Sequence, residues 1–304
     1  MERIGECKVL ARILGRCPPC FTTCSRLRIF SHISEKGEGC LIAHTSLAII
    51  EAEKIRNVFQ KPLYRVFNPG KLDADRLWEA MLSAILLHDL GKLTDNYQNP
   101  RSGWIRHNRV SAAIAKMSLE KLFEPEIGLK LAYGILLHHE ALEWKTLENS
   151  LKLNILVESV DFERYKVSEE RLELFRERLD ECLEKAYSVS IIDKACRKTL
   201  GNVLVDAVDE LRKNSGENLR LADILEIQRF FRCVDYQGPA MMAYRLIYLA
   251  DNRAASARES YWLDRMRECS WKPLDSIAVE IKRILPKRHH MIAMSSLPRE
   301  HNKL

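Results

Sequence analysis

The sequence predicts an all-α protein. Apolar residues recur three and four positions apart in successive segments, the spacing that places side chains on one face of a helix. No segment alternates apolar and polar residues convincingly over the length of a strand. A chain of 304 residues, 46% of them hydrophobic, is long enough to bury a sizeable core. We therefore expect a helical bundle.

We expect no membrane segment in this chain. Charged residues interrupt residues 1–20, so these lack the apolar core of a signal peptide, and no later stretch approaches a membrane span. The formal net charge of +6 is concentrated in residues 1–28 and 281–304, whereas residues 140–240 carry more acids than bases. Such mild basicity is weak evidence for a nucleic-acid partner, because a solvated surface explains it as well. We place the protein in the cytoplasm.

Residues 1–38 are interpreted as a basic, cysteine-rich N-terminal extension, to which we assign no chemistry. Five of the nine cysteines lie in the first forty residues: Cys7, Cys17, Cys20, Cys24 and Cys40. Cys17 and Cys20 have the C-x-x-C spacing, but the second pair that a zinc knuckle normally shows is missing. Structural zinc is thus the less favoured interpretation, and a disulfide stays open for a hyperthermophilic source.

Residues 41–59 predict the first helix of the bundle, with His44 in its first turn. Taken alone, a histidine on an apolar helix face is more often a packed residue than a ligand. We expect a loop after this helix, because Pro62, Pro69 and Gly70 follow it.

The next helix, from about residue 73 to 87, delivers the adjacent pair His88 and Asp89. The apolar face that carries His88 comprises Leu77, Ala80, Met81, Ala84 and Ile85. A carboxylate at a buried helix end is costly without a cation or a paired donor. We expect Gly91 to end the helix in the left-handed conformation and to turn Lys92 toward the same pocket. Considered alone, the pair is better explained as a capped helix with an ordinary core histidine.

The following segments bring further polar side chains to helix ends. Residues 94–103 predict a polar loop, suited to lining a cleft, that contains Tyr97 and Gln98. A helix is expected to begin near His107 and to end before Pro125. The next helix ends in two adjacent histidines, His138 and His139.

The C-terminal half predicts more helices. Residues 141–240 are expected to be helical and peripheral, with an amphipathic stretch around 172–183. Asp251 then shares a helix face with the apolar or aromatic residues Tyr244, Ile247, Tyr248 and Ala255. Residues 269–304 predict a short amphipathic helix and a basic tail.

Seven candidate metal ligands are expected at inner faces or helix ends. They are His44, His88, Asp89, His107, His138, His139 and Asp251. Any one of them has an ordinary explanation, but their convergence on one helical core has few. Imidazole and carboxylate ligands without thiolates favour Mn, Fe, Ni, Co, Zn or Mg.

This ordered set resembles the HD superfamily of metal-dependent phosphohydrolases, whose pattern is a histidine, an adjacent His-Asp pair and a later aspartate on successive helices. The resemblance spans about residues 42–256, and the additional histidines match the dinuclear branch. The segments His88-Asp89-Leu90-Gly91-Lys92, Tyr97-Gln98, Leu137-His138-His139 and 249–256 are similar to the stand-alone CRISPR-associated HD nuclease of type I systems. No phosphate-loop motif of a helicase accompanies them.

The resemblance implies an HD nuclease domain at residues 39–268, built as a helical bundle with a dinuclear metal site between its helices. It implies that His44, His88, Asp89 and Asp251 hold one divalent metal ion. Asp89 would bridge to a second ion held by His107, His138 and His139. Such a pair of ions binds phosphodiester oxygens and activates a water molecule.

The resemblance also implies roles beyond the metal ligands. Lys92 would stabilise charge developing on phosphorus, and Gln98 would orient substrate or water. The implied substrate is single-stranded DNA, with RNA as a second polymer. The implied partners are a separate CRISPR helicase subunit and the effector complex.

Two other functions stay open. A nucleotide phosphohydrolase or cyclic-nucleotide phosphodiesterase of the same superfamily would use the same ligands, although the lack of a Gly-Tyr-Pro signature after Asp89 argues against the cyclic-dinucleotide branch. A non-catalytic assembly subunit with a structural metal is least favoured, because the ligand set is complete. Residues 1–38 and the acidic helices have no counterpart in the family and are candidate docking surfaces.

Overall fold

The computed structural model describes residues 5–15, 27–34, 37–68, 70–99, 106–139, 163–219, 224–226 and 233–256. All of them lie in one compact unit of the chain, Met1–Leu263. The elements, in chain order, are α1 (Gly5–Leu14), β1 (Phe30–Ser34), β2 (Gly37–Cys40), α3 (Leu41–Phe67), α4 (Ala74–Leu87), η1 (Leu90–Leu93), α5 (Asp95–Gln98), α6 (His107–Leu119), α7 (Pro125–Leu136), η3 (Leu137–His139), β3 (Glu163–Arg164), α10 (Glu169–Ser188), α11 (Lys194–Lys213), β4 (Asn218–Leu219) and α14 (Val234–Ser256).

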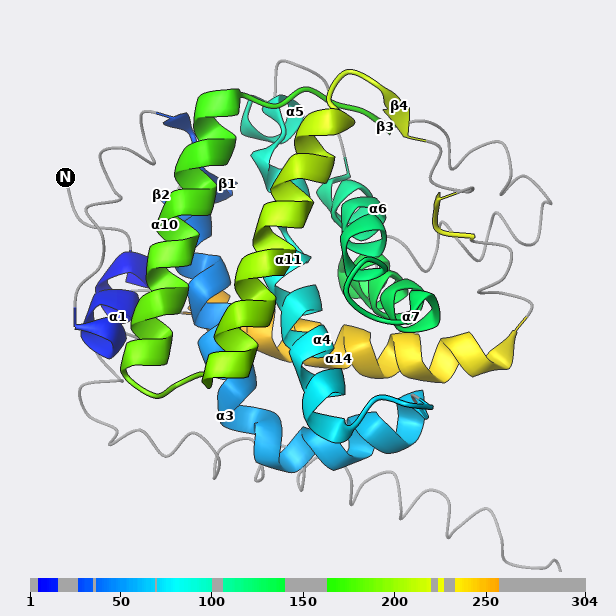
Figure 1. Ribbon diagram of the computed structural model, residues 1–304. Helices are drawn as coiled ribbons and strands as arrows, with labels where there is room; N and C mark the ends of the chain where they lie inside the picture. Colours follow the sequence, from blue (N-terminus) through cyan, green and yellow to red (C-terminus); the bar gives the residue numbers. More distant parts are fainter. Residues whose placement is uncertain are drawn as a thin grey trace, which may run out of the picture. The chain divides into compact units, whose positions relative to one another are not determined.

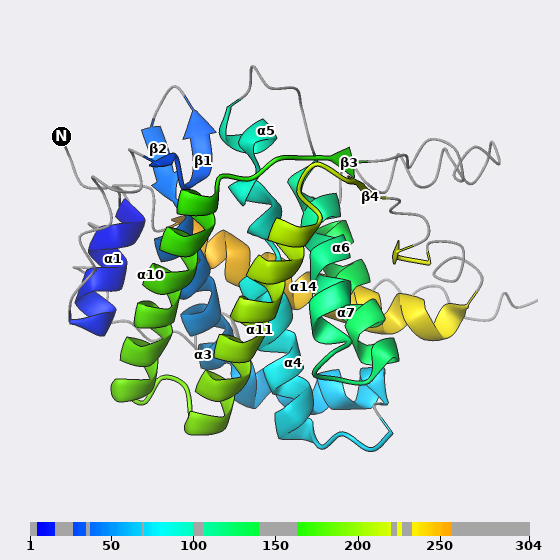
Figure 2. The same ribbon diagram turned by 45° about the horizontal axis from the view of Figure 1, so that its top comes forward.

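The core is formed by helices that pack on one another. Helix α14 packs against both α3 and α7, α4 packs beside α3, and α6 packs beside α7. Helices α10 and α11 lie side by side over α3 and α4 (Figures 1 and 2). The predicted all-α class is therefore confirmed. None of the described helices is long and apolar enough to cross a membrane.

Helix α3 is longer than predicted, because it continues through Pro62 to Phe67. A proline inside a helix removes one backbone hydrogen bond. Here Leu63 and Phe67 stay fully buried on the same face, and their packing offsets that loss. The predicted loop begins instead at Asn68, which adopts the left-handed conformation with φ of 43°.

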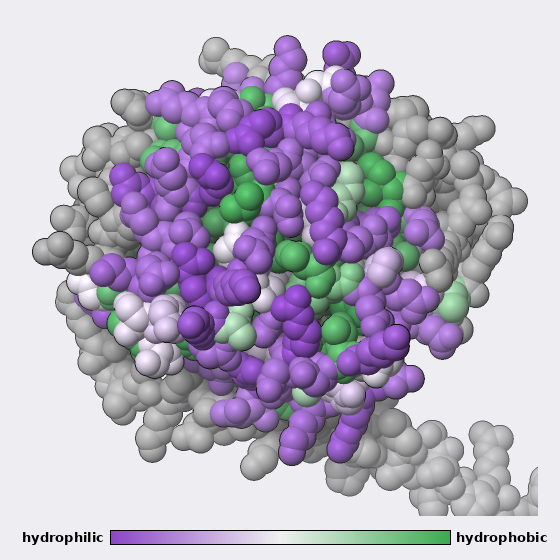
Figure 3. Space-filling view, in the orientation of Figure 1, coloured by the Kyte–Doolittle hydropathy of each residue, from purple (hydrophilic) through white to green (hydrophobic). Residues whose placement is uncertain are grey.

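Helices α10 and α11 confirm the predicted amphipathic pattern but are less peripheral than expected. Leu172, Phe175, Leu179 and Leu183 are all buried. Helix α10 packs on α3, and α11 packs on α4 and α6. Hydrophilic side chains predominate on the face shown in Figure 3, where α10 and α11 lie in front in Figure 1. Arg212 on α11 forms ion pairs with Glu169 and Glu173 on α10. Residues 141–162 lie outside the described part of the chain.

An antiparallel hairpin of β1 and β2 spans the end of the stretch that we interpreted as an N-terminal extension. Its strands are short, and β2 contains two glycines, so no alternating pattern identifies them in the sequence. The hairpin leads directly into α3, because β2 ends at Cys40 and α3 begins at Leu41. The Leu41 amide also donates to the carbonyl of Ile29, just before β1, at 3.1 Å. Helix α1 packs against α3 and β2 through its buried residues, which include Leu10 and Leu14.

Several predictions fall outside the described residues. They concern Cys17, Cys20, Cys24 and the helix and tail in 269–304. Cys7 and Cys40 are described, and both are buried.

Candidate metal centre

The predicted pair His88 and Asp89 lies at the buried end of α4. This helix begins at the N-cap Asp73, whose carboxylate accepts a hydrogen bond from the Arg76 amide at 2.7 Å. It is apolar along most of its length, so its C-terminal end is driven into the core. His88 is 0% exposed and Asp89 only 2% exposed. Side chains of such polarity at this depth require compensating partners.

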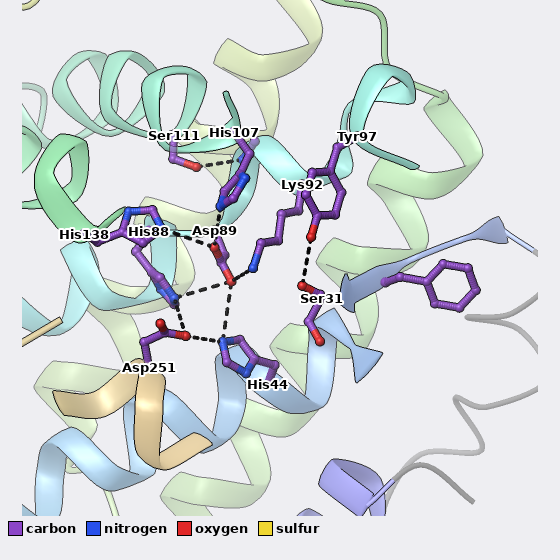
Figure 4. Close-up of polar contacts among 12 residues, drawn as sticks. Ser31, His44, His88, Asp89, Lys92, Tyr97, His107, Ser111, His138 and Asp251 are labelled. Atoms are coloured by element: carbon purple, nitrogen blue, oxygen red, sulfur yellow. Dashed lines mark hydrogen bonds and ion pairs between the residues drawn. The ribbon is translucent and has the colours of Figure 1, made fainter. Parts of the chain in front are cut away.

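Helices α3 and α14 supply the first set of partners. His44 Nε2 lies 2.9 Å from Asp251 Oδ1 and 3.4 Å from Asp89 Oδ2. His88 Nε2 lies 3.5 Å from Asp89 Oδ2 and 3.6 Å from Asp251 Oδ1. One ligand atom from each of the four residues lies within 4.8 Å of the others. Figure 4 shows the four side chains converging from three helices.

The N-terminus of α6 and the turn after α7 supply a second set. His107 Nε2 and His138 Nε2 lie 3.4 Å and 3.7 Å from Asp89 Oδ1. These three residues form a group with the same 4.8 Å limit. Asn108 links the two elements, because its amide donates to the Leu136 carbonyl at 2.8 Å.

Asp89 is the residue common to both groups, and each of its oxygens serves one of them. Oδ2 faces His44 and His88, whereas Oδ1 faces His107 and His138. A single carboxylate thus lies between two imidazole pairs (Figure 4).

Backbone carbonyls fix the tautomer of two of these histidines. His88 Nδ1 donates to the Ile85 carbonyl at 2.6 Å, and His138 Nδ1 donates to the Ile135 carbonyl at 2.6 Å. A carbonyl oxygen can only accept, so Nδ1 carries the proton in both rings. Each Nε2 then presents its lone pair to the centre, as in histidines that bind metals.

The residues of the cluster fit a bound cation. Within the described part of the chain, His88 Nε2 and Asp89 Oδ1 are buried and have no hydrogen-bond partner. Buried polar atoms are rarely left in this state. A divalent cation would satisfy both, and a set of imidazoles and carboxylates suits Mn, Fe, Co, Ni or Zn.

The charges of the cluster are strongly coupled. Burial alone would lower the pKa of His44, but the carboxylates of Asp251 and Glu6 outweigh it and raise this pKa to about 9. Burial lowers the pKa of His107 to about 3. Burial opposes ionisation of Asp89, yet Lys92 and the surrounding histidines bring its pKa well below the usual value. The ionised carboxylate of Asp89 and the neutral imidazole of His107 can thus bind a cation directly. His44, in contrast, carries a proton that a cation must displace.

Lys92 reaches the centre as predicted, from the short helix η1. Its ammonium donates to Asp89 Oδ2 at 2.6 Å and lies 5.8 Å from the Tyr97 ring centroid. The side chain is 11% exposed, and His107 and Asp251 are 12% and 24% exposed. These three residues therefore form the side of the cluster that solvent reaches.

Gly91 turns the chain for a different reason from the one we expected. It has no positive φ, so the predicted left-handed conformation is wrong. A Cβ atom at this position would lie only 2.2 Å from the His107 carbonyl oxygen, and the Gly91 amide donates to Ser111 Oγ at 2.8 Å. Glycine is needed here because α6 packs directly against the backbone of η1.

Gln98 is not turned toward the cluster. It ends the short helix α5, which replaces the first part of the predicted loop. Its amide donates to the carbonyls of Phe30 and Lys92 at 2.9 Å and 2.6 Å, and its oxygen accepts from the Phe30 amide at 3.2 Å. The structure therefore places Gln98 as a brace between β1 and η1, whereas we expected it to orient substrate or water.

His139 and Asp251 complete the set of predicted ligands. The side chain of His139 lies outside the described residues, so its place as a ligand stays a prediction. On α14, Tyr244 and Ile247 are buried as expected, but Tyr248 is 48% exposed, because it faces away from α3 and α7. Asp251 nevertheless reaches the cluster.

One contact of the cluster comes from the N-terminal stretch to which we assigned no chemistry. Glu6 on α1 is 0% exposed, and its Oε1 lies 3.3 Å from His44 Nδ1. No spacing rule links residues so far apart in the chain. The one available signal is an acid at the start of an otherwise apolar helix face.

Fold and site together define an all-α protein with a cluster of candidate metal ligands, in which a histidine, a His-Asp pair and an aspartate come from three helices. A comparison with solved structures finds a CRISPR-associated Cas3 HD domain protein from Methanocaldococcus jannaschii. It shares 22% sequence identity, with a TM-score of 0.35, and the match covers 56% of this chain and 95% of that one. Comparisons with protein-family models and with curated proteins find no match.

Proposed function

We propose that the chain is a metal-dependent nuclease of the HD type, which hydrolyses phosphodiester bonds of single-stranded DNA. RNA is a second candidate polymer. The observation that supports this proposal most strongly is the position of Asp89, whose two oxygens face two different pairs of histidines. This geometry is what a carboxylate shared by two cations requires.

The chain's residues would divide the work at such a site. His44, His88, Asp89 and Asp251 would hold one divalent cation, and Asp89, His107, His138 and the predicted ligand His139 would hold the second. When bound, the cations would polarise the phosphodiester and lower the pKa of a water molecule that attacks it. The backbone carbonyls of Ile85 and Ile135 keep two of the imidazoles in the tautomer that can bind a metal.

Lys92 supplies positive charge beside the cations. Its ammonium lies against Asp89 Oδ2 on the exposed side of the cluster. From there it would stabilise the negative charge that develops on the phosphoryl oxygens. Lys92 thus has a role in turnover that is separate from metal binding.

The biological setting is proposed from the sequence resemblance. The motifs around Asp89, His138 and Asp251 resemble those of the stand-alone HD nuclease of type I CRISPR systems. We therefore propose that the protein acts in the cytoplasm beside a separate helicase subunit and an effector complex.

The direct test is to incubate the purified chain with labelled single-stranded DNA, single-stranded RNA, deoxynucleoside triphosphates and cyclic dinucleotides, each with Mn²⁺, Mg²⁺ or EDTA. We expect cleavage of the polymers with metal and none with EDTA. Asp89→Asn should be inactive, whereas the matched control Asp75→Asn, at an exposed carboxylate on α4, should retain activity. Consumption of the mononucleotides alone would contradict the nuclease proposal and favour a nucleotide phosphohydrolase.

A further inference from the structure

Helix α1 brings a buried carboxylate to the far side of a candidate metal ligand. Glu6 is 0% exposed, and its Oε1 lies 3.3 Å from His44 Nδ1. The other ring nitrogen, Nε2, faces Asp89 and Asp251. The imidazole of His44 therefore lies between Glu6 on one side and the candidate metal centre on the other.

The carboxylate of Glu6 is held in a defined orientation. Its Oε2 accepts from the Cys40 amide at 2.8 Å, and Ser31 Oγ lies 3.5 Å from both oxygens. Cys40 is the N-cap residue of α3, and its own side chain makes no capping bond. A negative charge at a helix N-terminus is favourable, so the start of α3 compensates for burying Glu6.

The other histidines show what Glu6 does for His44. His88 and His138 donate their Nδ1 protons to backbone carbonyls three residues earlier, which leaves Nε2 to face the centre. Beside His44 Nδ1, the carboxylate of Glu6 takes the place that a backbone carbonyl takes beside the other two histidines. An acceptor at Nδ1 fixes the ring's tautomer and orientation, and a carboxylate also makes the ring a stronger ligand.

We propose that Glu6 is a positioning residue for metal binding, which holds the proton of His44 on Nδ1 and so directs Nε2 toward the cation. This inference rests on the metal site of the proposed function. It gives the N-terminal stretch a part in the chemistry, although Glu6 itself contacts neither cation nor substrate.

Glu6→Gln is the sharpest substitution. The amide oxygen can still accept from the Cys40 amide, but the NH₂ group would face His44 Nδ1. His44 must then accept there, and its proton moves to Nε2, where it opposes metal binding. The matched control is Glu79→Gln, at a buried acid on α4 that binds Arg76 and Thr199 instead.

The experiment is an isothermal titration of the metal-free parent chain and variants, residues 1–304, with Mn²⁺, accompanied by thermal unfolding of each. We expect the apparent Kd for Mn²⁺ to rise about tenfold to a hundredfold in Glu6→Gln and to stay at the parent value in Glu79→Gln. An unchanged Kd in Glu6→Gln would overturn this inference alone. Failure of the parent chain to bind Mn²⁺ would overturn the proposed function together with it.

A second measurement needs no folded Glu6 variant. The parent chain, labelled with ¹⁵N-histidine and loaded with Zn²⁺, should show His44 protonated at Nδ1 and metal-bound at Nε2, with the signal assigned by its loss in His44→Gln. A His44 ring protonated at Nε2 would overturn the inference.

Discussion

The backbone of Gly91 lies so close to His107 that a Cβ atom would come within 2.2 Å of the His107 carbonyl oxygen. This approach brings the N-terminus of α6 to Asp89. We predict that Gly91→Ala lowers the free energy of unfolding by about 1–3 kcal/mol, since the backbone must shift to admit the methyl group. It should also weaken metal binding by the group that contains His107. Urea unfolding and Mn²⁺ titration measure the two effects.

The matched control is Gly238→Ala on α14. The nearest heavy atom to a Cβ there is Val66 Cγ1, at 4.0 Å. Alanine should leave stability nearly unchanged, because its methyl group clashes with no neighbouring element and its preference for the helix is opposed by the ring of Pro239, which follows it. Equal losses in the two variants would contradict the explanation from close packing.

Lys92→Met should separate turnover from metal binding. We expect much slower cleavage with a metal content near that of the parent, because Lys92 is not a ligand. Without metal the variant should be less stable by about 3–5 kcal/mol, since Asp89 loses its ammonium partner at 2.6 Å. Added Mn²⁺ should restore most of this loss. A metal content that falls together with activity would contradict the division of roles.

Metal binding should release protons near neutral pH. The pKa of His44 is raised to about 9, so the ring is protonated at pH 7 in the metal-free chain, and a ligand must be neutral. The pKa of His107 is lowered to about 3, so that ring is already neutral and releases none. The apparent affinity should therefore rise with pH up to about 9.

Calorimetric titrations in buffers of different ionisation enthalpy count these protons. We expect about one proton from His44 per chain at pH 7. An affinity that does not depend on pH between 6 and about 9 would contradict the protonation of His44.

Gln98→Leu tests whether this residue is a brace. The substitution leaves the amide and carbonyl of Phe30 and the carbonyl of Lys92 without their partner. We predict a loss of about 2–4 kcal/mol in the free energy of unfolding. In the fraction that stays folded, KM should change little. A large rise in KM at unchanged stability would instead support the expected role in orienting substrate.

Helical periodicity was sufficient to predict most of the cluster. His44 and His88 each lie on an apolar helix face, so their burial follows from the positions of their neighbours. Asp251 also lies on such a face, although its side chain stays 24% exposed. Asp89 and His138 follow the ends of apolar helices, so their positions near the core were also predictable. These residues converge because the helices that carry them pack together. Periodicity does not predict which helices pack together, and the grouping of the ligands was instead implied by the superfamily resemblance.

Long-range contacts could not be predicted in this way. Glu6 reaches His44 only because α1 packs on α3, and the β1–β2 hairpin that orients this approach has no alternating pattern. Gly91 was predicted to adopt the left-handed conformation, but glycine is required there because of α6, which follows later in the chain. The same is true of Gln98, whose partners on β1 are 68 residues away.

The central claim is that Asp89 serves two cations, and metal content per chain tests it most directly. Mass spectrometry of Mn²⁺-loaded protein should find about two ions in the parent, about one in Asp251→Ala and almost none in Asp89→Ala. This order follows because Asp251 faces only the first group, whereas Asp89 faces both. Equal metal content in Asp89→Ala and Asp251→Ala would contradict the claim.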